Sequence, residues 1–188
     1  MSKPRRINSQ IKFFEELEEK FLKSKEEGTI IAVLENTEVI YNPNYSINQE
    51  YCDKHNIKAF EGKIDSIGVG VVASGSLVLT VKRQEKGGEA MSDKFTKDLC
   101  NYFKAKKLPA VRQDNNDILV NDLKVASGGE ISINGWRYMG YQISVNQDYD
   151  AIENVCLKKS VKKPGALSDF GITTEEMFAF CKEYWEEE

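Results

Sequence analysis

The sequence contains one histidine and four cysteines, and no two cysteines form a Cys-x-x-Cys pair. This supply of ligands argues against a zinc site and against a redox dithiol. The chain also lacks an apolar run of about 20 residues, the length that a membrane-spanning helix needs. Its beginning is charged and amphipathic where a secretory signal would be apolar. We therefore expect a soluble, cytoplasmic protein without a membrane partner.

Neither sign of charge dominates the sequence. The 26 basic and 30 acidic residues give a formal net charge of −4 and are spread along the 188 residues. Binding to a nucleic-acid backbone needs a large basic face, so no nucleic-acid partner is expected. The hydrophobic content of 40% and the absence of internal repeats predict one domain that covers residues 1–188.

Apolar residues at helical spacing predict helices over 9–25, 93–105 and 148–160. The first of these helices has its apolar face at Phe14, Leu17 and Phe21. A last helix is expected to begin at Thr173, because Glu176 follows at the spacing of a capping box. Its buried face is expected to contain Met177, Cys181 and Tyr184.

Strand patterns occupy the intervals between these helices. "TIIAVL" and "EVIY" read as two strands, and "SIGVGVVASGSLVLTVKR" as two more, joined at Gly75. "DILV" and "LKVA" are spaced for a tight hairpin. "EISI" connects to "WRYMGYQISV" through Asn134-Gly135, a pair that favours a type I′ turn. The predicted fold class is α+β, with one mixed, mainly antiparallel sheet and flanking helices.

Lys124 is followed directly by small residues in "KVASGG". Backbone of this kind allows a flat or phosphorylated ligand to approach closely, and the ammonium and the glycine amides could meet the same anion. The alternative is a solvent-exposed strand lysine. "GVGVVASG", residues 68–75, is a second candidate cradle for a phosphate or acyl chain, although a glycine-containing strand pair with a bulge explains it more simply.

Several reactive or aromatic residues favour a structural interpretation. Cys156 falls on the expected buried face of its helix and is interpreted as a packing residue. His55 lies in a polar turn and is expected at the surface. Trp136 and Tyr138 alternate along the second hairpin and are expected to pack on a sheet face, with the lining of an apolar acyl channel as the alternative.

The order of these motifs resembles the catalytic domain of the superfamily of lipoate–protein ligases, octanoyltransferases and biotin–protein ligases. In that superfamily an Asn-Asp pair begins a strand and a lysine follows within it, which here matches Asn116, Asp117 and Lys124. A downstream pattern of His-Gly, an apolar strand and an Asn is similar to Met139, Gly140, "YQISV" and Asn146. The resemblance spans most of the chain and is nearest in motif order to the lipoate–protein ligases.

The resemblance implies a class II synthetase or biotin–lipoate ligase-like fold and acyl chemistry on a carrier protein. Ligases of this type join lipoate or biotin to ATP as an acyl-adenylate and pass the acyl group to a lysine of a small carrier domain. Lys124 would be the catalytic cation beside the carboxylate and α-phosphate. Asn116 and Asp117 would position the nucleotide, with Asp117 as a ligand of Mg²⁺. The implied nucleotide and acyl site is completed by Gly68, Gly70, Ser127, Gly128, Gly129 and Gly140.

The sequence departs from the lipoate-ligase pattern at two points. "GKIDSIGVGVVASGS" contains no arginine and no histidine, where lipoate ligases have an Arg-Arg pair, a triple glycine and then a Val-x-His-Asp stretch. Asn115 stands where an arginine often precedes the Asn-Asp pair. Losing these cations removes charge-assisted contacts to phosphate. This favours a second class of function, a non-catalytic relative that binds an acyl ligand, a nucleotide or a carrier domain.

An octanoyl-type acyltransferase is the third class of function. These enzymes use a cysteine nucleophile in a loop that corresponds to "KKPGALSDFGIT", which contains no cysteine. The sequence also ends soon after the expected core, where many ligases carry a further C-terminal domain, so an accessory subunit is a candidate partner in addition to the carrier.

Overall fold

The computed structural model of the chain describes residues 5–9, 12, 23–41, 44, 46–61, 69–72, 74–155 and 162–186. Its strands and helices are, in chain order, β1 (Arg5–Ile7), β2 (Gly28–Leu34), β3 (Glu38–Tyr41), α2 (Gln49–Lys54), β4 (Lys58–Glu61), β5 (Val69–Val72), β6 (Ser76–Gln84), α3 (Met91–Ala105), β7 (Ala110–Arg112), β8 (Ile118–Val120), β9 (Leu123–Ile133), β10 (Trp136–Ser144), α4 (Tyr149–Val155), the 3₁₀ helix η2 (Leu167–Phe170) and α5 (Thr174–Glu186).

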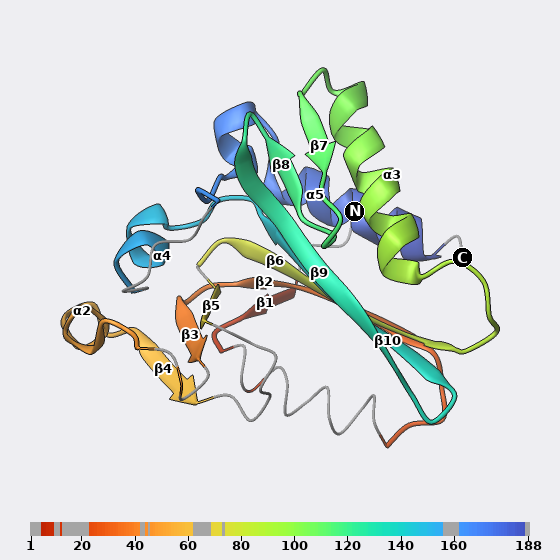
Figure 1. Cartoon of the computed structure of the whole chain (residues 1–188), viewed down its shortest axis with the longest axis horizontal. Coiled ribbons are helices and arrows are strands. Elements are labelled where there is room, and N and C mark those ends of the chain that lie inside the picture. The colour runs from red at the N-terminus through yellow and green to blue at the C-terminus, as the bar shows by residue number, and fades with distance from the viewer. Residues whose placement is uncertain are drawn as a thin grey trace.

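Seven of the strands form one large sheet in the order β1-β2-β6-β10-β9-β8-β7 (Figure 1). Every neighbouring pair is antiparallel except β1 and β2, which run parallel. The longest pairing joins β6 to β10, from Ser76 opposite Ser144 to Gln84 opposite Trp136. The predicted α+β class with a mixed, mainly antiparallel sheet and flanking helices is confirmed.

The expectation of a single sheet is wrong, because β3, β4 and β5 form a second sheet in the order β4-β3-β5. The two strands read from "SIGVGVVASGSLVLTVKR" are therefore not a pair: β5 belongs to the small sheet and β6 to the large one. Gly75 makes the change of direction with φ +84°, and a Cβ atom at this position would lie 1.9 Å from the Asn146 carbonyl oxygen. Only glycine fits so close an approach at a positive φ.

Two tight turns connect the strands around the candidate residues. Asn121 and Asp122 join β8 to β9 with φ values of 50° and 62°, and Asn134 and Gly135 join β9 to β10 with φ values of 52° and 77°. Positive φ at both central residues is the property of a type I′ turn, which confirms the predicted turn at Asn134-Gly135. "LKVA" and "EISI", however, are not separate strands. They belong to one strand, β9, because its pairing with β10 continues through the small residues between them.

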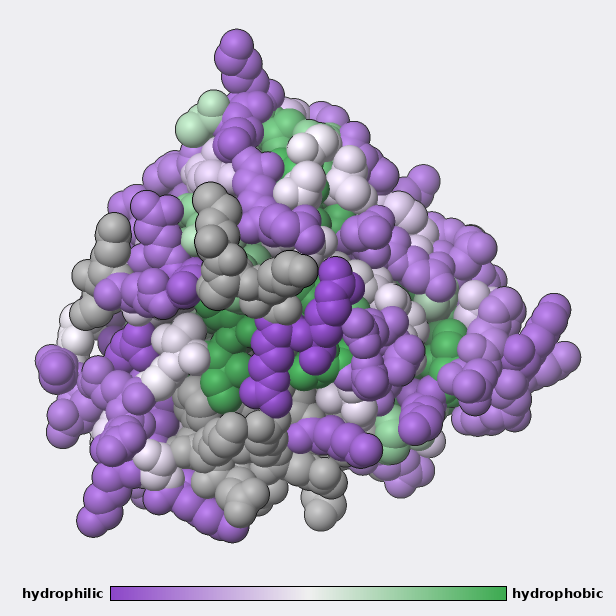
Figure 2. All heavy atoms as spheres, turned by 180° about the vertical axis from the view of Figure 1, so that it is seen from behind, coloured by the Kyte–Doolittle hydropathy of each residue, from purple (hydrophilic) through white to green (hydrophobic). Residues whose placement is uncertain are grey.

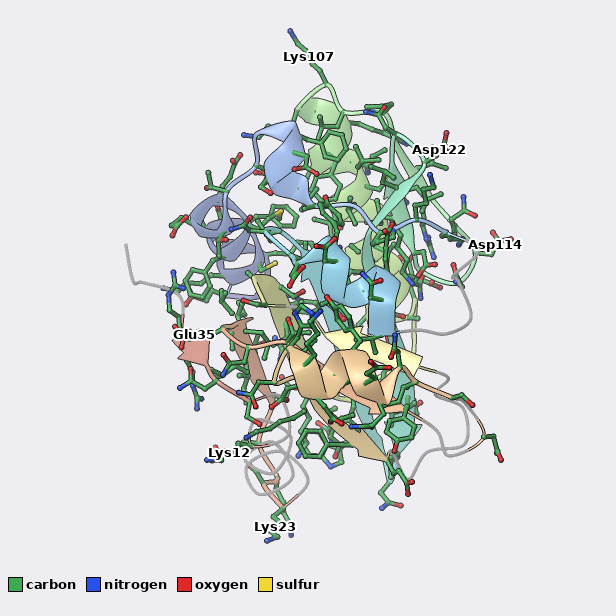
Figure 3. All side chains as sticks on the ribbon, turned by 90° about the vertical axis from the view of Figure 1, so that its left-hand side faces the viewer. Lys12, Lys23, Glu35, Lys107, Asp114 and Asp122 are labelled. Carbon is green, nitrogen blue, oxygen red and sulfur yellow. The ribbon has the colours of Figure 1, made fainter. Side chains whose placement is uncertain are left out.

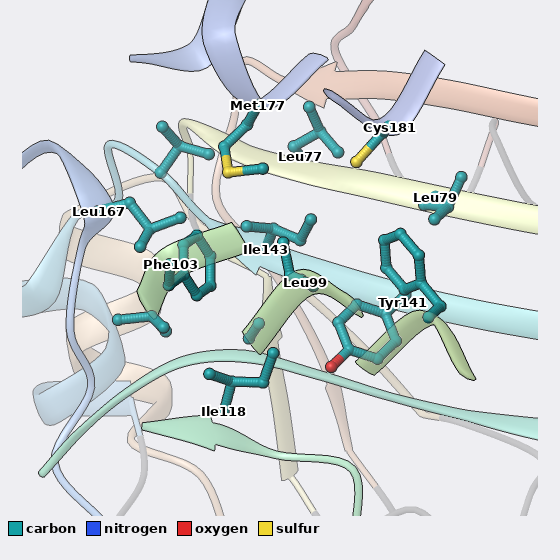
Figure 4. Packing of buried hydrophobic residues seen from close by; sticks show 14 of the residues in the cluster. Leu77, Leu79, Leu99, Phe103, Ile118, Tyr141, Ile143, Leu167, Met177 and Cys181 are labelled. Carbon is teal, nitrogen blue, oxygen red and sulfur yellow. The ribbon is translucent and has the colours of Figure 1, made fainter. Parts of the chain in front are cut away.

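Helices α3 and α5 pack on one face of the large sheet and enclose the main hydrophobic core (Figure 4). Tyr141 on β10 and Phe95 on α3 form a T-shaped pair, with ring centroids 5.1 Å apart and an angle of 86° between the rings. Each fully buried large apolar side chain stabilises the fold by about 1.5–3 kcal/mol. The core side chains labelled in Figure 4 are Leu77, Leu79, Leu99, Phe103, Ile118, Tyr141, Ile143, Leu167, Met177 and Cys181.

The last helix begins as predicted, since the Glu176 amide donates to Thr173 Oγ1 over 3.1 Å. Met177 and Cys181 are buried, but Trp185 takes the third core position that was expected for Tyr184. Tyr184 is half-buried because its hydroxyl donates to Asp98 Oδ2 over 3.1 Å at the edge of the core.

Helix α3 confirms the predicted helix over 93–105, and α4 confirms the first part of the one expected over 148–160. Cys156 and the rest of that helix lie outside the described residues. Most of the helix predicted over 9–25, with its apolar face, also lies outside them.

The small sheet, α2 and α4 share a second hydrophobic cluster, which includes Val39, Cys52 and Val155. His55 follows α2 at the surface, as predicted, and stacks on Tyr51 with ring centroids 4.1 Å apart. Hydrophilic side chains cover most of the molecular face in Figure 2, and the hydrophobic areas between them are small. Among the described residues, no helix is long and apolar enough to cross a membrane.

At two adjacent glycines in β9, an added methyl group is expected to change the free energy of unfolding in opposite directions. A Cβ atom on Gly128 would lie 2.1 Å from the Tyr141 ring and 2.4 Å from the Gly140 carbonyl oxygen, whereas one on Gly129 would meet nothing within 4 Å. We expect Gly128→Ala to lower the free energy of unfolding by about 1–3 kcal/mol through overpacking. Gly129→Ala should raise it by up to about 0.5–1 kcal/mol, because a strand glycine costs conformational entropy. Urea denaturation of both variants tests this, and equal effects would contradict it.

Candidate functional site

A β-bulge in β9 determines the direction of the Lys124 side chain. Ile118 on β8 pairs with Ala126, but the next residue, Leu119, pairs with Lys124, so Val125 is an extra residue on β9. Val125 and Ala126 are both buried in the core. Because the bulge interrupts the alternation, Lys124 leaves the core and lies on the other side of the sheet.

The Lys124 ammonium forms an ion pair with Asp117, the residue just before β8. Lys124 Nζ lies 3.0 Å from Asp117 Oδ1; the lysine side chain is 37% exposed and the aspartate side chain 5%. The structure therefore brings together two of the residues that the sequence singled out. Two other acidic residues near β8 in the sequence, Asp114 and Asp122, are exposed and point outward (Figure 3).

A second lysine, Lys162, contacts the other oxygen of the same carboxylate. Lys162 Nζ lies 3.0 Å from Asp117 Oδ2, and its side chain is 30% exposed. Asn115 Nδ2 also donates to Asp117 Oδ2, over 3.0 Å. Both carboxylate oxygens are thus engaged, by two ammonium groups and one amide. Lys162 was not predicted as a site residue. Its local sequence, two lysines before Pro-Gly, gives no indication of a contact with Asp117, which lies far away in the chain.

Lys162 is the first residue of a short segment, residues 162–166, that lies along the start of β9. We call this segment the strap. The Lys124 amide donates to the Lys163 carbonyl oxygen and the Gly165 amide donates to the Lys124 carbonyl oxygen, both over 2.8 Å. A Cβ atom on Gly165 would lie 2.6 Å from Leu123 Cβ, so the close pairing requires glycine. Gln147 Nε2 also donates to the Gly165 carbonyl oxygen, over 2.8 Å.

The charges around Asp117 lower the pKa of its carboxyl group. Burial alone would raise this pKa, but the hydrogen bonds from Lys124 and Lys162 outweigh burial, and Asn115 adds to them. The carboxyl group is therefore an anion at neutral pH and holds both ammonium groups in place.

Asn116 points away from this cluster. Its backbone is left-handed, with φ 61°, a conformation that asparagine tolerates. Its Oδ1 accepts from Arg112 Nη2 over 3.0 Å and its Nδ2 donates to Ser92 Oγ over 3.3 Å. Its carbonyl oxygen accepts from the Tyr141 hydroxyl over 2.9 Å. The Asn-Asp pair is therefore divided: Asp117 contacts the lysines and Asn116 ties the turn to α3 and β10.

The candidate glycines fall into three groups. Gly129 and Gly140 pair directly across β9 and β10, and the space where a Cβ atom would stand is open at both. Gly128 faces the core under Tyr141 and has a packing role. Gly70 lies in β5 opposite Ile40, in the small sheet. Gly68 lies outside the described residues, and its assignment stays a prediction.

Ser127 is half-buried in β9 opposite Gln142. Its place in a strand, beside Gly128 and Gly129, means that the small residues after Lys124 do not form a separate loop. Trp136 and Tyr138 pack on the sheet face, as expected, and their rings lie 4.2 Å and 5.7 Å from the Lys82 ammonium.

A magnesium ion at Asp117 would compete with the contacts already made there. Both carboxylate oxygens face ammonium groups, and the residues that the structure describes contain no group of three His, Cys, Asp or Glu side chains that could hold a metal. The described side chains thus do not form a metal site of their own. Asp117 as its ligand stays a prediction.

No protein-family model matches the sequence, and no curated protein matches it. Solved structures do match: the chain has the fold found in lipoate–protein ligases. The structure of P. falciparum LipL1 in complex with lipoate aligns with a TM-score of 0.71 and 17% identity, over 97% of this chain and 60% of that one. The present chain thus spans less than two thirds of LipL1.

Two further structures have the same fold. Lipoate-protein ligase A bound with ATP aligns with a TM-score of 0.69 and 15% identity, over 95% of this chain and 82% of that one. The bi-partite lipoate protein ligase from Thermoplasma acidophilum, studied with its E2 lipoyl domain, aligns with a TM-score of 0.69 and 16% identity, over 95% of this chain and 80% of that one. Identities this low establish the fold and leave activity to be tested.

Replacing Asp117 should destabilise the protein in a pH-dependent way. Asp117→Asn removes the negative charge that both ammonium groups contact, and because both lysines are partly exposed we expect a loss of about 1–2 kcal/mol at neutral pH, less than for a fully buried pair. The folded pKa lies below the ordinary value of 3.8, so the parent keeps this stability above that value and loses it as the pH falls through the folded pKa.

Chemical denaturation of parent and variant over a series of pH values measures the difference in unfolding free energy. It should shrink toward acid pH. A difference that is constant with pH would mean that the charge of Asp117 has no part in it.

Proposed function

We propose that the protein attaches a lipoyl or related acyl group to a lysine of a small carrier domain, through an acyl-adenylate made with ATP. The observation that carries this proposal is the cluster of Lys124, Asp117 and Lys162 in a fold found in lipoate–protein ligases. A lipoate complex, an ATP complex and a system with an E2 lipoyl domain among the structures of similar fold support it.

The charges of the cluster suit this chemistry. The cluster places two ammonium groups beside one buried carboxylate, and the side chains of both lysines are partly exposed. In the first step an oxygen of the acid's carboxylate attacks the α-phosphorus of ATP and pyrophosphate leaves. In the second step the neutral amine of the carrier lysine attacks the acyl carbon, AMP leaves and a proton is released. A fixed ammonium beside the phosphate and carboxylate stabilises the negative charge that develops there.

Lys124 is suited to this part because its backbone is hydrogen-bonded on both sides. Its amide and carbonyl groups are hydrogen-bonded to the strap, and its strand is paired with β8. Gly129 and Gly140, with open space beside them, would let an acyl group or nucleotide lie against the sheet. Preorganised charges of this kind need little rearrangement when a substrate reacts.

A binding protein without catalytic activity is the second candidate function. The stretch of residues 62–76 lacks the arginines and the histidine of the lipoate-ligase pattern, which favours binding without adenylation. The acyltransferase function has less support, because the stretch that matches its cysteine loop supplies Lys162, Pro164 and Gly165 and pairs with Lys124.

Exchange of pyrophosphate into ATP separates these functions. We expect exchange that depends on one acid from a panel of lipoate, octanoate and biotin, followed by transfer of the same acyl group to a carrier domain. Binding of an acid or nucleotide without exchange would support the non-catalytic relative. Acyl transfer from a preloaded carrier, with a thioester trapped on Cys156, would support the acyltransferase instead.

Lys124→Gln should separate folding from function. The variant keeps a side chain of similar length, and Lys162 still neutralises Asp117, so we expect a melting temperature close to that of the parent. Acyl loading of the carrier should fall by about 10²–10³-fold, the effect of removing one preorganised electrostatic group. Thermal melts and a carrier-loading assay make the two measurements.

Lys97→Gln is the matched control, since Lys97 is an exposed residue of α3, the helix that packs on the core face. It removes the same charge and should leave loading unchanged. If Lys124→Gln also loads the carrier at the parent rate, Lys124 is an ordinary strand lysine and its assignment is wrong.

A further inference from the structure

The peptide group that joins Asn116 to Asp117 is held at both of its ends. On one side its carbonyl oxygen accepts a hydrogen bond from the Tyr141 hydroxyl over 2.9 Å. On the other side its N–H, which belongs to Asp117, donates to Asn115 Oδ1 over 3.4 Å. Because a peptide group is planar, holding both ends fixes the direction in which the chain enters Asp117. The orientation of this peptide group therefore bears on where the Asp117 carboxylate lies.

This peptide group needs such contacts because Asn116 has a left-handed backbone, with φ 61°. Residues other than glycine keep this conformation where the surrounding structure imposes it. Arg112 and Ser92 hold the Asn116 side chain, but both of these contacts are made by the side-chain amide and not by the peptide group. The Tyr141 hydroxyl is the contact that reaches from β10 to the backbone beside Asp117.

Tyr141 can hold this group because its own ring is fixed. The residue is 3% exposed, and its ring forms a T-shaped pair with Phe95. Gly128 pairs directly with Tyr141 across β9 and β10, and a Cβ atom on this glycine would lie 2.1 Å from the ring. The ring thus lies against β9 at a point where only glycine leaves room. In Figure 4 the hydroxyl points to the side on which Ile118 lies, the residue that follows Asp117.

We propose that Tyr141 is a positioning residue of the site, whose hydroxyl orients the peptide group before Asp117 and thereby the Asp117 carboxylate. That carboxylate in turn directs the Lys124 ammonium, which lies 3.0 Å from its Oδ1. Gly128, one of the small residues after Lys124, takes part by leaving room for the tyrosine ring. The effect on activity rests on the proposed function, whereas the effect on the ion pair does not.

A stability cycle with Tyr141→Phe and Asp117→Asn tests the link between hydroxyl and carboxylate without any substrate. Tyr141→Phe removes only the hydroxyl and leaves the ring in the core. If the hydroxyl orients the carboxylate, part of its effect on the free energy of unfolding depends on the ion pairs of Asp117. We therefore expect a smaller effect of Tyr141→Phe in the Asp117→Asn background. Urea denaturation of the parent, both single variants and the double variant measures this coupling.

Tyr184→Phe is the matched control for this cycle. The Tyr184 hydroxyl donates to Asp98 on α3 and its ring also packs on Phe95, so the variant removes a comparable hydroxyl from the same aromatic cluster. Its effect on stability should be the same with and without Asp117→Asn. If the effect of Tyr141→Phe is also the same in both backgrounds, the hydroxyl only satisfies its own burial and the inference is wrong.

Carrier loading is the second readout. Misplacing a group of the site by about 1 Å can lower a rate by about 10²-fold, so we expect Tyr141→Phe to lower kcat for loading by about tenfold to hundredfold. The KM for the carrier should not change, and Tyr184→Phe should load at the parent rate. In a parent that loads the carrier, coupling without a fall in kcat, or a fall in kcat without coupling, overturns the positioning role. A parent that loads no carrier refutes the proposed function, and the stability cycle alone then decides the inference.

Discussion

A carboxylate that is almost fully buried must be paired, and this requirement at Asp117 organises the site. An uncompensated charge in a protein interior costs several kcal/mol. Asp117 avoids this cost through Lys124, Lys162 and Asn115, which come from β9, the strap and the turn before β8. These contacts hold three segments together around one anion. The orientation of Lys124 is therefore set by electrostatics as well as by the strand that carries it.

Features that depend on neighbouring residues could be predicted from the sequence. Asn134-Gly135 forms the expected turn because both residues accept positive φ. Thr173 begins α5 because its hydroxyl and the Glu176 amide are only three residues apart. The hairpin of β8 and β9 follows from a short apolar strand on each side of Asn121-Asp122. Each of these outcomes is decided within a few residues.

Features that depend on distant contacts could not be predicted. The small residues after Lys124 looked like the end of a strand, but β10 supplies partners throughout and β9 continues. The bulge at Val125 is visible only in the register with β8, and it decides on which face Lys124 lies. The buried face of α5 also depends on distant contacts. The spacing of apolar residues along the helix predicted Tyr184 at the core, but the way the helix packs against the core buries Trp185 instead.

The strap has a consequence for the order in which the protein folds. Asp117 and Lys162 are 45 residues apart in the sequence, and β8, β9, β10 and α4 lie between them. The hairpin of β8 and β9 can form early because its contacts are local, whereas closing a long loop costs entropy that only later packing repays. During synthesis the carboxylate exists before its second lysine. A nascent chain without the strap holds Asp117 and Lys124 but not the completed cluster, so the double ion pair at Asp117 can form only after the strap has been synthesised.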